Sequence, residues 1–235
     1  MLEIRGLSVS YGPIVAVREL SLVAEPGRIT AILGANGAGK SSVIRAVAGL
    51  TASRGDIRLA GHDLKGLEAH QRARLGLGCV LEGRRLFREL TIEENLEVAW
   101  RFGPRRSPFA TMRDATFGHF PILAEKRAVP AGLLSGGQQQ MLIISCTTVR
   151  SPECLLLDEP SLGLAPVIVQ QVFDFIVETS RRLQTTVVLT EQMAALALRI
   201  ADFGYVMRQG AMVLNGDRET LLEPLHSRKL TEAYL

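Results

Sequence analysis

At residues 34–41 the chain reads Gly34-Ala35-Asn36-Gly37-Ala38-Gly39-Lys40-Ser41, which fits the phosphate-binding loop pattern G-x-x-x-x-G-K-[ST] at every fixed position. The apolar run Ile29–Leu33 before it predicts a buried strand, and apolar residues at three- and four-residue spacing after it predict an amphipathic helix. In this context the glycines let backbone N–H groups surround an anion at the positive end of a helix dipole. The stretch therefore predicts a site for a nucleoside triphosphate rather than an ordinary glycine-rich turn.

Two side chains of this loop carry specific chemistry. Lys40 would reach the β- and γ-phosphates, and the hydroxyl of Ser41 would hold Mg²⁺. The loop thus predicts that the triphosphate binds together with Mg²⁺.

The chain has 235 residues, of which 47% are apolar and 22% are charged. This length suits one large domain, or one domain with an insertion, and the composition allows a substantial core. No apolar run approaches the roughly eighteen residues needed to span a bilayer. Residues 1–4 lead directly into an alternating strand pattern, so no signal peptide is visible.

The cysteines and histidines predict neither disulfides nor a metal centre. Cys79, Cys146 and Cys154 are odd in number and lack C-x-x-C spacing, which is typical of reduced, mostly buried thiols in a cytosolic protein. The four histidines form no ligand pattern, so we expect no metal site made of protein groups alone.

The formal net charge is +3, and much of the excess comes from arginines between residues 84 and 113. They could bind an anionic partner, either lipid head groups or nucleic acid, or they could form a solvated face. We favour the solvated face and expect no nucleic acid partner, because no aromatic residues interleave with these charges. The arginines are Arg84, Arg85, Arg88, Arg101, Arg105, Arg106 and Arg113.

Hydrophobic patterning divides the chain into three parts. Short strand patterns separated by turns fill residues 2–61, and the pattern changes near residue 90. There Thr91-Ile92-Glu93-Glu94 is a capping box that predicts a helix start, although residues 103–132 are only weakly patterned. We interpret about 86–150 as a helical insertion. Strand–helix alternation then resumes, with strands over 154–157 and 185–189, helices over 165–183 and 194–200, and a hairpin over 205–214.

A pair of carboxylates follows the apolar strand Cys154–Leu157. Asp158 and Glu159 come directly after it, and ligands of open α/β sheets bind at the carboxyl ends of strands. Asp158 suits water-mediated contact with Mg²⁺, and Glu159 can orient and deprotonate an attacking water. A solvated acidic pair is the alternative, which the nearby phosphate loop makes less favourable.

A second anion-binding helix start is predicted at Leu134-Ser135-Gly136-Gly137-Gln138. Ser135 is a good N-cap for the helix that follows, and the two glycines expose the backbone. On its own, Ser-Gly-Gly is a routine linker fragment.

Together, the phosphate loop, Leu-Ser-Gly-Gly-Gln and Leu-Leu-Leu-Asp-Glu-Pro, in this order, resemble the ATPase domain of ABC transporters. The resemblance covers essentially the whole chain. It implies an α/β fold in which a phosphate-loop NTPase core carries an N-terminal antiparallel β subdomain. It also implies that the helical insertion of about 86–150 belongs to a single domain spanning 1–235 and carries the Ser135 motif.

The resemblance also implies residue roles. Tyr11 would stack on adenine, and Ser135, Gly136, Gly137 and Gln138 would contact the ATP bound to an opposite subunit. Glu82 would join Ser41 and Asp158 at Mg²⁺, while Lys40, Glu159 and Gln192 would act in catalysis. The phosphates would be held by Gly34, Ala35, Asn36, Gly37, Ala38, Gly39, Lys40, Ser41 and Ser42.

Several further stretches are similar to one ATPase subunit of branched-chain amino acid importers, the LivF type. Relatives of that subunit serve importers for urea, amides and aromatic acids, so the resemblance does not identify the solute. The stretches are Leu81–Phe87, Thr91–Leu96, Pro160–Pro166, Glu191-Gln192, Ile200–Val206 and the ending Ala233-Tyr234-Leu235.

Some residues depart from the general ABC pattern. Glu82 replaces a usual glutamine and Gln192 a usual histidine, as is common in the LivF type, and Leu81 replaces a proline. Cys146 replaces a usual arginine after the Ser135 motif. Because that arginine is expected to be structural, its absence bears on local stability or regulation more than on hydrolysis.

The function implied is ATP hydrolysis by the ATPase subunit of an amino acid importer, peripheral to the cytoplasmic face of the membrane. Expected partners are separate transmembrane permeases, a second ATPase subunit (identical or a sister chain) and, indirectly, an extracytoplasmic solute-binding protein. The alternatives are a soluble ABC ATPase of DNA repair or translation and a catalytically weak regulatory subunit. The absence of a long heptad arm within 42–133 disfavours the first, and Lys40, Asp158 and Glu159 disfavour the second.

Overall fold

A computed structural model describes residues 1–83, 85–103 and 107–223 of the chain. Arg84, Arg105 and Arg106 of the predicted basic group, and the ending Ala233-Tyr234-Leu235, lie outside the described residues. Among the described helices, none is long and apolar enough to cross a membrane.

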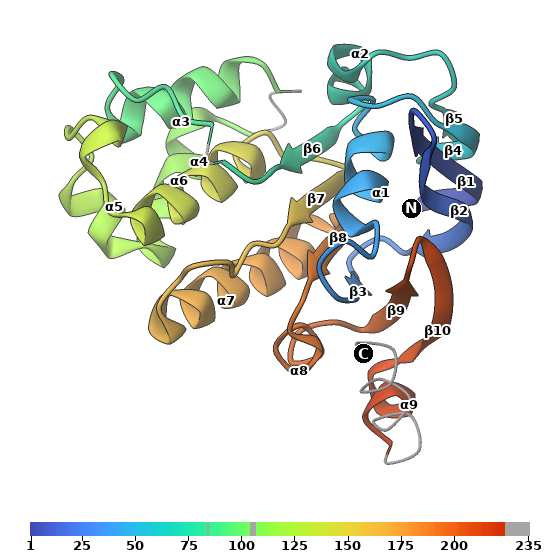
Figure 1. Ribbon diagram of the computed structural model, residues 1–235. Coiled ribbons are helices and arrows are strands. Elements are labelled where there is room, and N and C mark those ends of the chain that lie inside the picture. The colour runs from blue at the N-terminus through green and yellow to red at the C-terminus, as the bar shows by residue number, and fades with distance from the viewer. Residues whose placement is uncertain (84, 104–106, 224–235) are drawn as a thin grey trace.

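Two sheets form the framework of the molecule (Figure 1). The first is antiparallel, with strand order β2-β1-β4-β5. Its strands are β1 (Leu2–Tyr11), β2 (Ile14–Ala24), β4 (Arg54–Leu59) and β5 (His62–Asp63). The second has order β10-β9-β3-β8-β7-β6 and is parallel except for the β9–β10 hairpin. Its strands are β3 (Ile29–Leu33), β6 (Leu77–Val80), β7 (Cys154–Asp158), β8 (Thr186–Glu191), β9 (Phe203–Arg208) and β10 (Ala211–Asp217).

The parallel sheet is covered on both faces, so its strands are buried runs without polar alternation. Alternate residues of β7 enter different cores: Leu156 packs with the antiparallel sheet and α1 (Lys40–Val47), while Leu155 and Leu157 pack with the other helices. The long helix α7 (Pro166–Leu183) lies on that second face. The phosphate-loop helix α1 is thus held between the two sheets (Figure 1).

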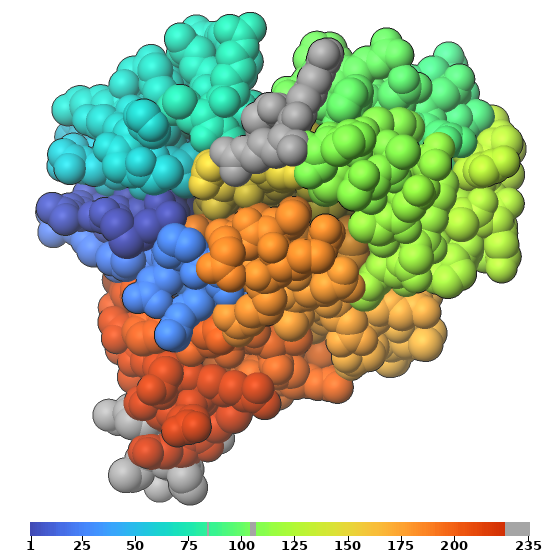
Figure 2. Space-filling model, turned by 180° about the vertical axis from the view of Figure 1, so that it is seen from behind, coloured from blue at the N-terminus to red at the C-terminus, as the bar shows by residue number. Residues whose placement is uncertain are grey.

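Four helices gather at one side of the parallel sheet, and we call them the helical group (Figure 1). They are α3 (Ile92–Arg101), α4 (Phe109–His119), α5 (Pro121–Glu125) and α6 (Gly136–Thr148). Seen from behind, this group and the antiparallel sheet occupy opposite edges, with the segment around α7 between them (Figure 2). The capping box predicted at Thr91 and the N-cap predicted at Ser135 are confirmed by the hydrogen bonds of both helix starts, and the Gln138 side chain makes the second a capping box as well.

Several elements differ from the sequence expectation. The weakly patterned region 103–132 forms α4 and α5, because α4 buries little more than Met112 and Thr116 and so shows no clear apolar stripe. Four elements were not predicted, namely β5, β6, α2 (Ala69–Arg74) and α9 (Arg218–Leu222), and α8 (Ala194–Ala197) is shorter than predicted. In β6, Gly78 looks like a strand breaker, but a Cβ there would lie 2.7 Å from Thr147 Cγ2, so glycine allows α6 to pack closely.

The segment before α3 is fixed by a single side chain, Asn95, which is 3% exposed. Its Oδ1 accepts from Phe87 N at 3.0 Å. Its Nδ2 lies 2.8–3.1 Å from the carbonyl oxygens of Phe87, Leu90 and Thr91. Asn95 therefore anchors the end of the loop of residues 81–91. Glu82 and Arg85 belong to the first half of this loop.

We predict that Asn95→Ala lowers the free energy of unfolding by about 2–4 kcal/mol, because it removes the hydrogen bonds of a buried side chain and leaves the Phe87 N–H without its acceptor. Denaturant unfolding of the purified chain measures the change. Glu97→Ala on the same helix is the control, since its ion pair with Arg101 is exposed and should contribute less than about 1 kcal/mol. Equal losses in the two variants would contradict the anchoring role.

Candidate active site

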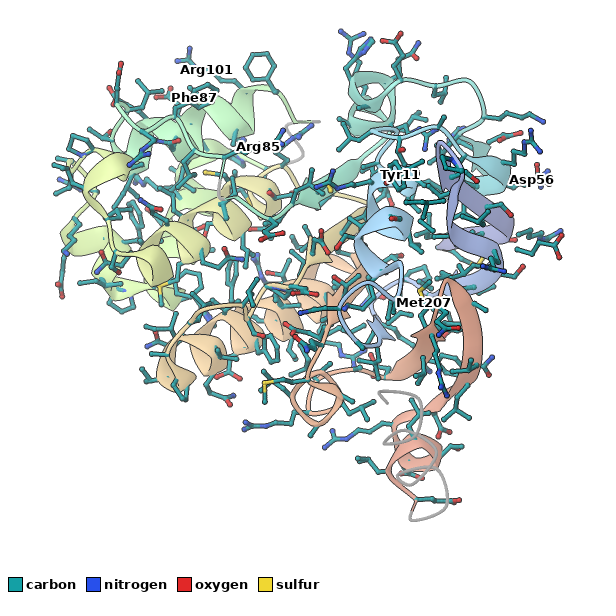
Figure 3. The ribbon with its side chains drawn as sticks, in the orientation of Figure 1. Tyr11, Asp56, Arg85, Phe87, Arg101 and Met207 are labelled. Carbon is teal, nitrogen blue, oxygen red and sulfur yellow. The ribbon has the colours of Figure 1, made fainter. Side chains whose placement is uncertain are left out.

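The loop between β3 and α1 has the backbone that its glycines require. Gly39 has a φ of 100°, and a Cβ on it would lie 2.3 Å from the carbonyl oxygen of Ala16. A Cβ on Gly34 would lie 2.5 Å from the carbonyl oxygen of Met207, which Figure 3 labels on β9. Any side chain at either position would push the loop away from β2 or β9, so these glycines keep the loop closed around the start of α1.

Lys40 is the first residue of α1 and is 4% exposed. Its Nζ donates to the carbonyl oxygens of Gly34 at 2.9 Å and Ala35 at 3.1 Å, and it lies 3.1 Å from Glu159 Oε1. A buried ammonium is stable only with such partners. Because all of them belong to the loop or to the end of β7, the cation is held where a polyphosphate would meet it.

Ser41 and Asp158 are already paired. Asp158 Oδ1 accepts from Ser41 Oγ at 2.9 Å and from Thr190 Oγ1 at 2.8 Å. No group of three or more histidine, cysteine, aspartate or glutamate side chains that could hold a metal occurs in the described part of the chain. The Ser41–Asp158 pair does fit Mg²⁺, which is usually bound by one or two carboxylates together with substrate phosphates and water.

Glu159 follows β7 in a left-handed conformation with a φ of 46°. Its backbone N–H lies 3.1 Å from Thr190 Oγ1 and 3.2 Å from the Thr190 carbonyl oxygen. Strained backbone of this kind persists only where the surroundings hold it. Here it turns the carboxylate of Glu159 back toward Lys40.

These residues line a cavity of about 500 Å³, which we call the loop cavity. Tyr11 lies at its edge beside α1 (Figure 3). Ala16 and Leu162 contribute to the lining and were not predicted. The predicted residues that the structure brings together here are Tyr11, Asn36, Gly37, Gly39, Lys40, Ser41, Ser42, Glu82, Asp158 and Glu159.

Other predicted residues lie apart from the loop cavity. Gln192 is exposed after β8 and is absent from the lining, and α8 has no side-chain cap, so Gln192 does not cap that helix. Ser135 caps α6, and Gln138 Oε1 accepts from Ser135 N at 3.1 Å. Their predicted contact with an opposite subunit's ATP, together with Gly136 and Gly137, stays a prediction.

The sequence analysis gave no role to Glu191, the last residue of β8. This residue is buried, and its Oε1 accepts from Ser161 N at 3.0 Å. Burial, with a smaller effect of the neighbouring Glu159, raises the pKa of the Glu191 carboxyl. The hydrogen bond from Ser161 N to Glu191 fixes the turn after Glu159.

All three cysteines are free, and Cys146 and Cys154 are buried. Burial raises the pKa of the Cys79 thiol and of the Cys154 thiol to about 12, so both are neutral at ordinary pH. Cys146 belongs to the apolar core between the helices and the parallel sheet. The position of the usual arginine is therefore filled here by a neutral thiol.

A parallel sheet whose strand ends carry a phosphate loop and two carboxylates defines a phosphate-loop nucleoside triphosphatase. A family model described as "ABC transporter" matches residues 17–162. The chain belongs to the ABC transporter family, as an ATP-binding subunit that binds and hydrolyses ATP.

Individual relatives cover the chain from end to end. It is 41% identical to the high-affinity branched-chain amino acid transport ATP-binding protein BraG of Pseudomonas aeruginosa, over 100% of this chain and 99% of the relative. It is 33% identical to a probable branched-chain amino acid transport ATP-binding protein, LivF, of Archaeoglobus fulgidus, over 98% of each. Among solved structures, an ATP-binding cassette of an ABC transporter has a TM-score of 0.87 at 23% identity, over 100% of this chain and 98% of the other.

We predict that Glu191→Gln changes the pH dependence of stability. The folded-state pKa of this carboxyl is raised above 4.5, so folding favours the protonated form. Stability is therefore lost as pH rises from the unfolded pKa through the raised folded pKa. The glutamine keeps an oxygen for Ser161 N but carries no charge, so the variant should match the parent at about pH 4 and be more stable at about pH 8.

Urea unfolding at both pH values measures the difference. Glu125→Gln on α5 is the control, because that side chain is exposed and should give no such divergence. Parallel stability profiles for the parent and Glu191→Gln would contradict the prediction.

Proposed function

We propose that this chain is the ATPase subunit of an ABC importer for branched-chain amino acids or related solutes. The observation that carries the proposal is the full-length match, at 41% identity, to a branched-chain amino acid transport ATP-binding protein, together with a complete set of phosphate-loop and strand-end groups. ATP binding and hydrolysis would drive transport through separate permease chains. Uptake of urea, amides or aromatic acids is the alternative, since the site contacts nucleotide and not solute.

In this proposal the loop cavity binds Mg–ATP. The backbone N–H groups of residues 34–39 surround the phosphates, and Tyr11 at the cavity edge stacks on the adenine. Lys40 exchanges its carbonyl partners for the β- and γ-phosphates. Ser41, Asp158 and Glu82 would hold Mg²⁺, which supplies positive charge to the phosphate oxygens when it is bound.

Glu159 would act as the base. In the structure its carboxylate is paired with Lys40. When Lys40 turns to the phosphates, Glu159 becomes free to orient a water and accept its proton. Binding of the phosphates would thus release the base.

The remaining assignments depend on partners. Ser135, Gly136, Gly137 and Gln138 would complete the site of a second ATPase subunit, because they lie outside this chain's own cavity. The helical insertion of about 86–150 would carry them as part of a single domain. The permeases would hold the subunit at the cytoplasmic face of the membrane, and an extracytoplasmic solute-binding protein would act through them.

We predict that Glu159→Gln binds ATP but turns it over roughly 10²-fold or more slowly, because the amide has the same shape and cannot take a proton. ATP affinity should not fall, since the substitution also removes the ion pair that competes for Lys40. Nucleotide binding and steady-state phosphate production by the purified transport complex measure the two effects. Glu125→Gln should leave both unchanged, and near-normal hydrolysis by Glu159→Gln would refute the role of base.

A further prediction concerns Gln192, which is exposed and follows Glu191 at the sheet edge. If its amide donates to the γ-phosphate in the assembled complex, Gln192→Ala should lower kcat on the order of 10²-fold with little change in ATP affinity. Gln192→His should keep activity and gain a pH dependence near neutrality. Steady-state ATPase assays from about pH 6 to about pH 9 test this, with exposed Met193→Ala as the control. A Gln192→Ala profile equal to that of the parent would place the residue outside catalysis.

A further inference from the structure

A second cavity, of about 630 Å³, lies next to the loop cavity, and we call it the far cavity. Glu82, Asp158, Glu159 and Leu162 line both cavities, so the two share a wall. The rest of its lining comes from the 81–88 loop, from Ala131 and from the first turns of α6. The far cavity is therefore adjacent to the groups proposed to cleave ATP, on the side away from the phosphate loop.

Gln140 of α6 points to a ligand in the far cavity. The residue is 8% exposed and lines the cavity, yet its side-chain amide makes no hydrogen bond with any described residue. Its amide atoms are not among the fully buried polar atoms that lack a partner in the described residues, so they are open to the space of the cavity, where they can hydrogen-bond to a bound ligand. The neighbouring Gln139, in contrast, donates to the carbonyl oxygens of Ala131 and Leu134.

The charges around the far cavity favour an anion. Arg85 and Arg88 line it, and neither guanidinium is paired with a carboxylate among the described residues. Three carboxylates also line the cavity: Glu159 is paired with Lys40, Asp158 accepts two hydroxyl hydrogens, and Glu82 is exposed to solvent. Arg85 lies at the edge of the helical group that faces α1, whereas Arg101 lies farther from α1 (Figure 3).

We propose that the far cavity binds the inorganic phosphate produced by hydrolysis, with Gln140, Arg85 and Arg88 as its ligands. This inference rests on the proposed ATPase function. In that reaction the terminal P–O bond of ATP breaks, the water oxygen bonds to phosphorus, ADP leaves, and Glu159 accepts the proton that the water loses. The phosphate then leaves ADP and passes the shared wall, whose carboxylates repel it. The guanidinium groups of Arg85 and Arg88 in the far cavity attract it.

The test measures binding of radiolabelled inorganic phosphate to the full-length protein by equilibrium dialysis, with ADP present and without ATP. Gln140→Leu and Arg88→Gln should each raise the dissociation constant for phosphate about tenfold, the usual effect of losing a hydrogen bond to a charged group. Arg101→Gln is the charge-matched control and should bind like the parent. Equal phosphate affinity in Gln140→Leu, Arg88→Gln and the parent would overturn the proposal.

A second variant distinguishes phosphate binding in the far cavity from phosphate binding in the loop cavity. Lys40→Ala should lose nucleotide binding but keep phosphate binding in the far cavity. If Lys40→Ala loses phosphate and Gln140→Leu keeps it, the ion binds in the phosphate loop and the proposal fails. Because no ATP is cleaved in this experiment, failure of the ATPase assignment would appear separately, as absent turnover in the parent.

A purely structural role for Gln140 gives a different result. Gln140→Leu removes an amide that has no partner, so the variant should unfold at the parent's temperature or above it. It should also produce the same amount of acid-quenched ADP in a single turnover as the parent. A clear drop in unfolding temperature, or loss of ATP cleavage with unchanged phosphate affinity, would show that Gln140 supports the fold or the chemistry instead.

Discussion

The parallel register of β3, β8 and β7 is the constraint on which the site depends. It pairs Leu33 with Glu191 and Asp158 with Thr190, so the phosphate loop and the acidic residues emerge at one edge of the sheet. The hydroxyls of Ser41 and Thr190 both donate to Asp158 Oδ1, which ties α1, β7 and β8 together through one carboxylate oxygen. A shift of one residue in any of these strands would separate the loop from its acidic partners.

A buried charge network follows from this register. Lys40 cannot remain buried without compensation, which comes from two loop carbonyls and Glu159. The phosphates of ATP would offer the same cation charged acceptors, which bind an ammonium group more strongly than neutral carbonyl oxygens do. Burial raises the pKa of the Glu191 carboxyl, one residue beyond Thr190, and its Oε1 accepts from Ser161 N, which fixes the turn after Glu159.

Sequence reasoning succeeded where local signals and burial agree. The strand Ile29–Leu33, the capping box at Thr91, the N-cap at Ser135 and the carboxylates after the apolar strand were all visible as patterns. It failed where packing decides the structure: Gly78 looks like a breaker, although α6 requires it in β6, and α4 lacks an apolar stripe. The buried position of Glu191 and the far cavity could not be predicted, because both are formed by segments distant in sequence.

The loop from Leu81 to Leu90 connects β6 of the parallel sheet to α3 of the helical group. Its beginning continues β6, which pairs with β7 through Val80 and Leu157, and its end is held by the four contacts of Asn95. Between these anchors it presents Glu82 to both cavities and Arg85 and Arg88 to the far cavity. An anion bound between α6 and this loop would therefore connect the helical group to β6, the strand that pairs with β7 beside Asp158 and Glu159. The distance between the helical group and the sheet would then depend on whether phosphate is still bound.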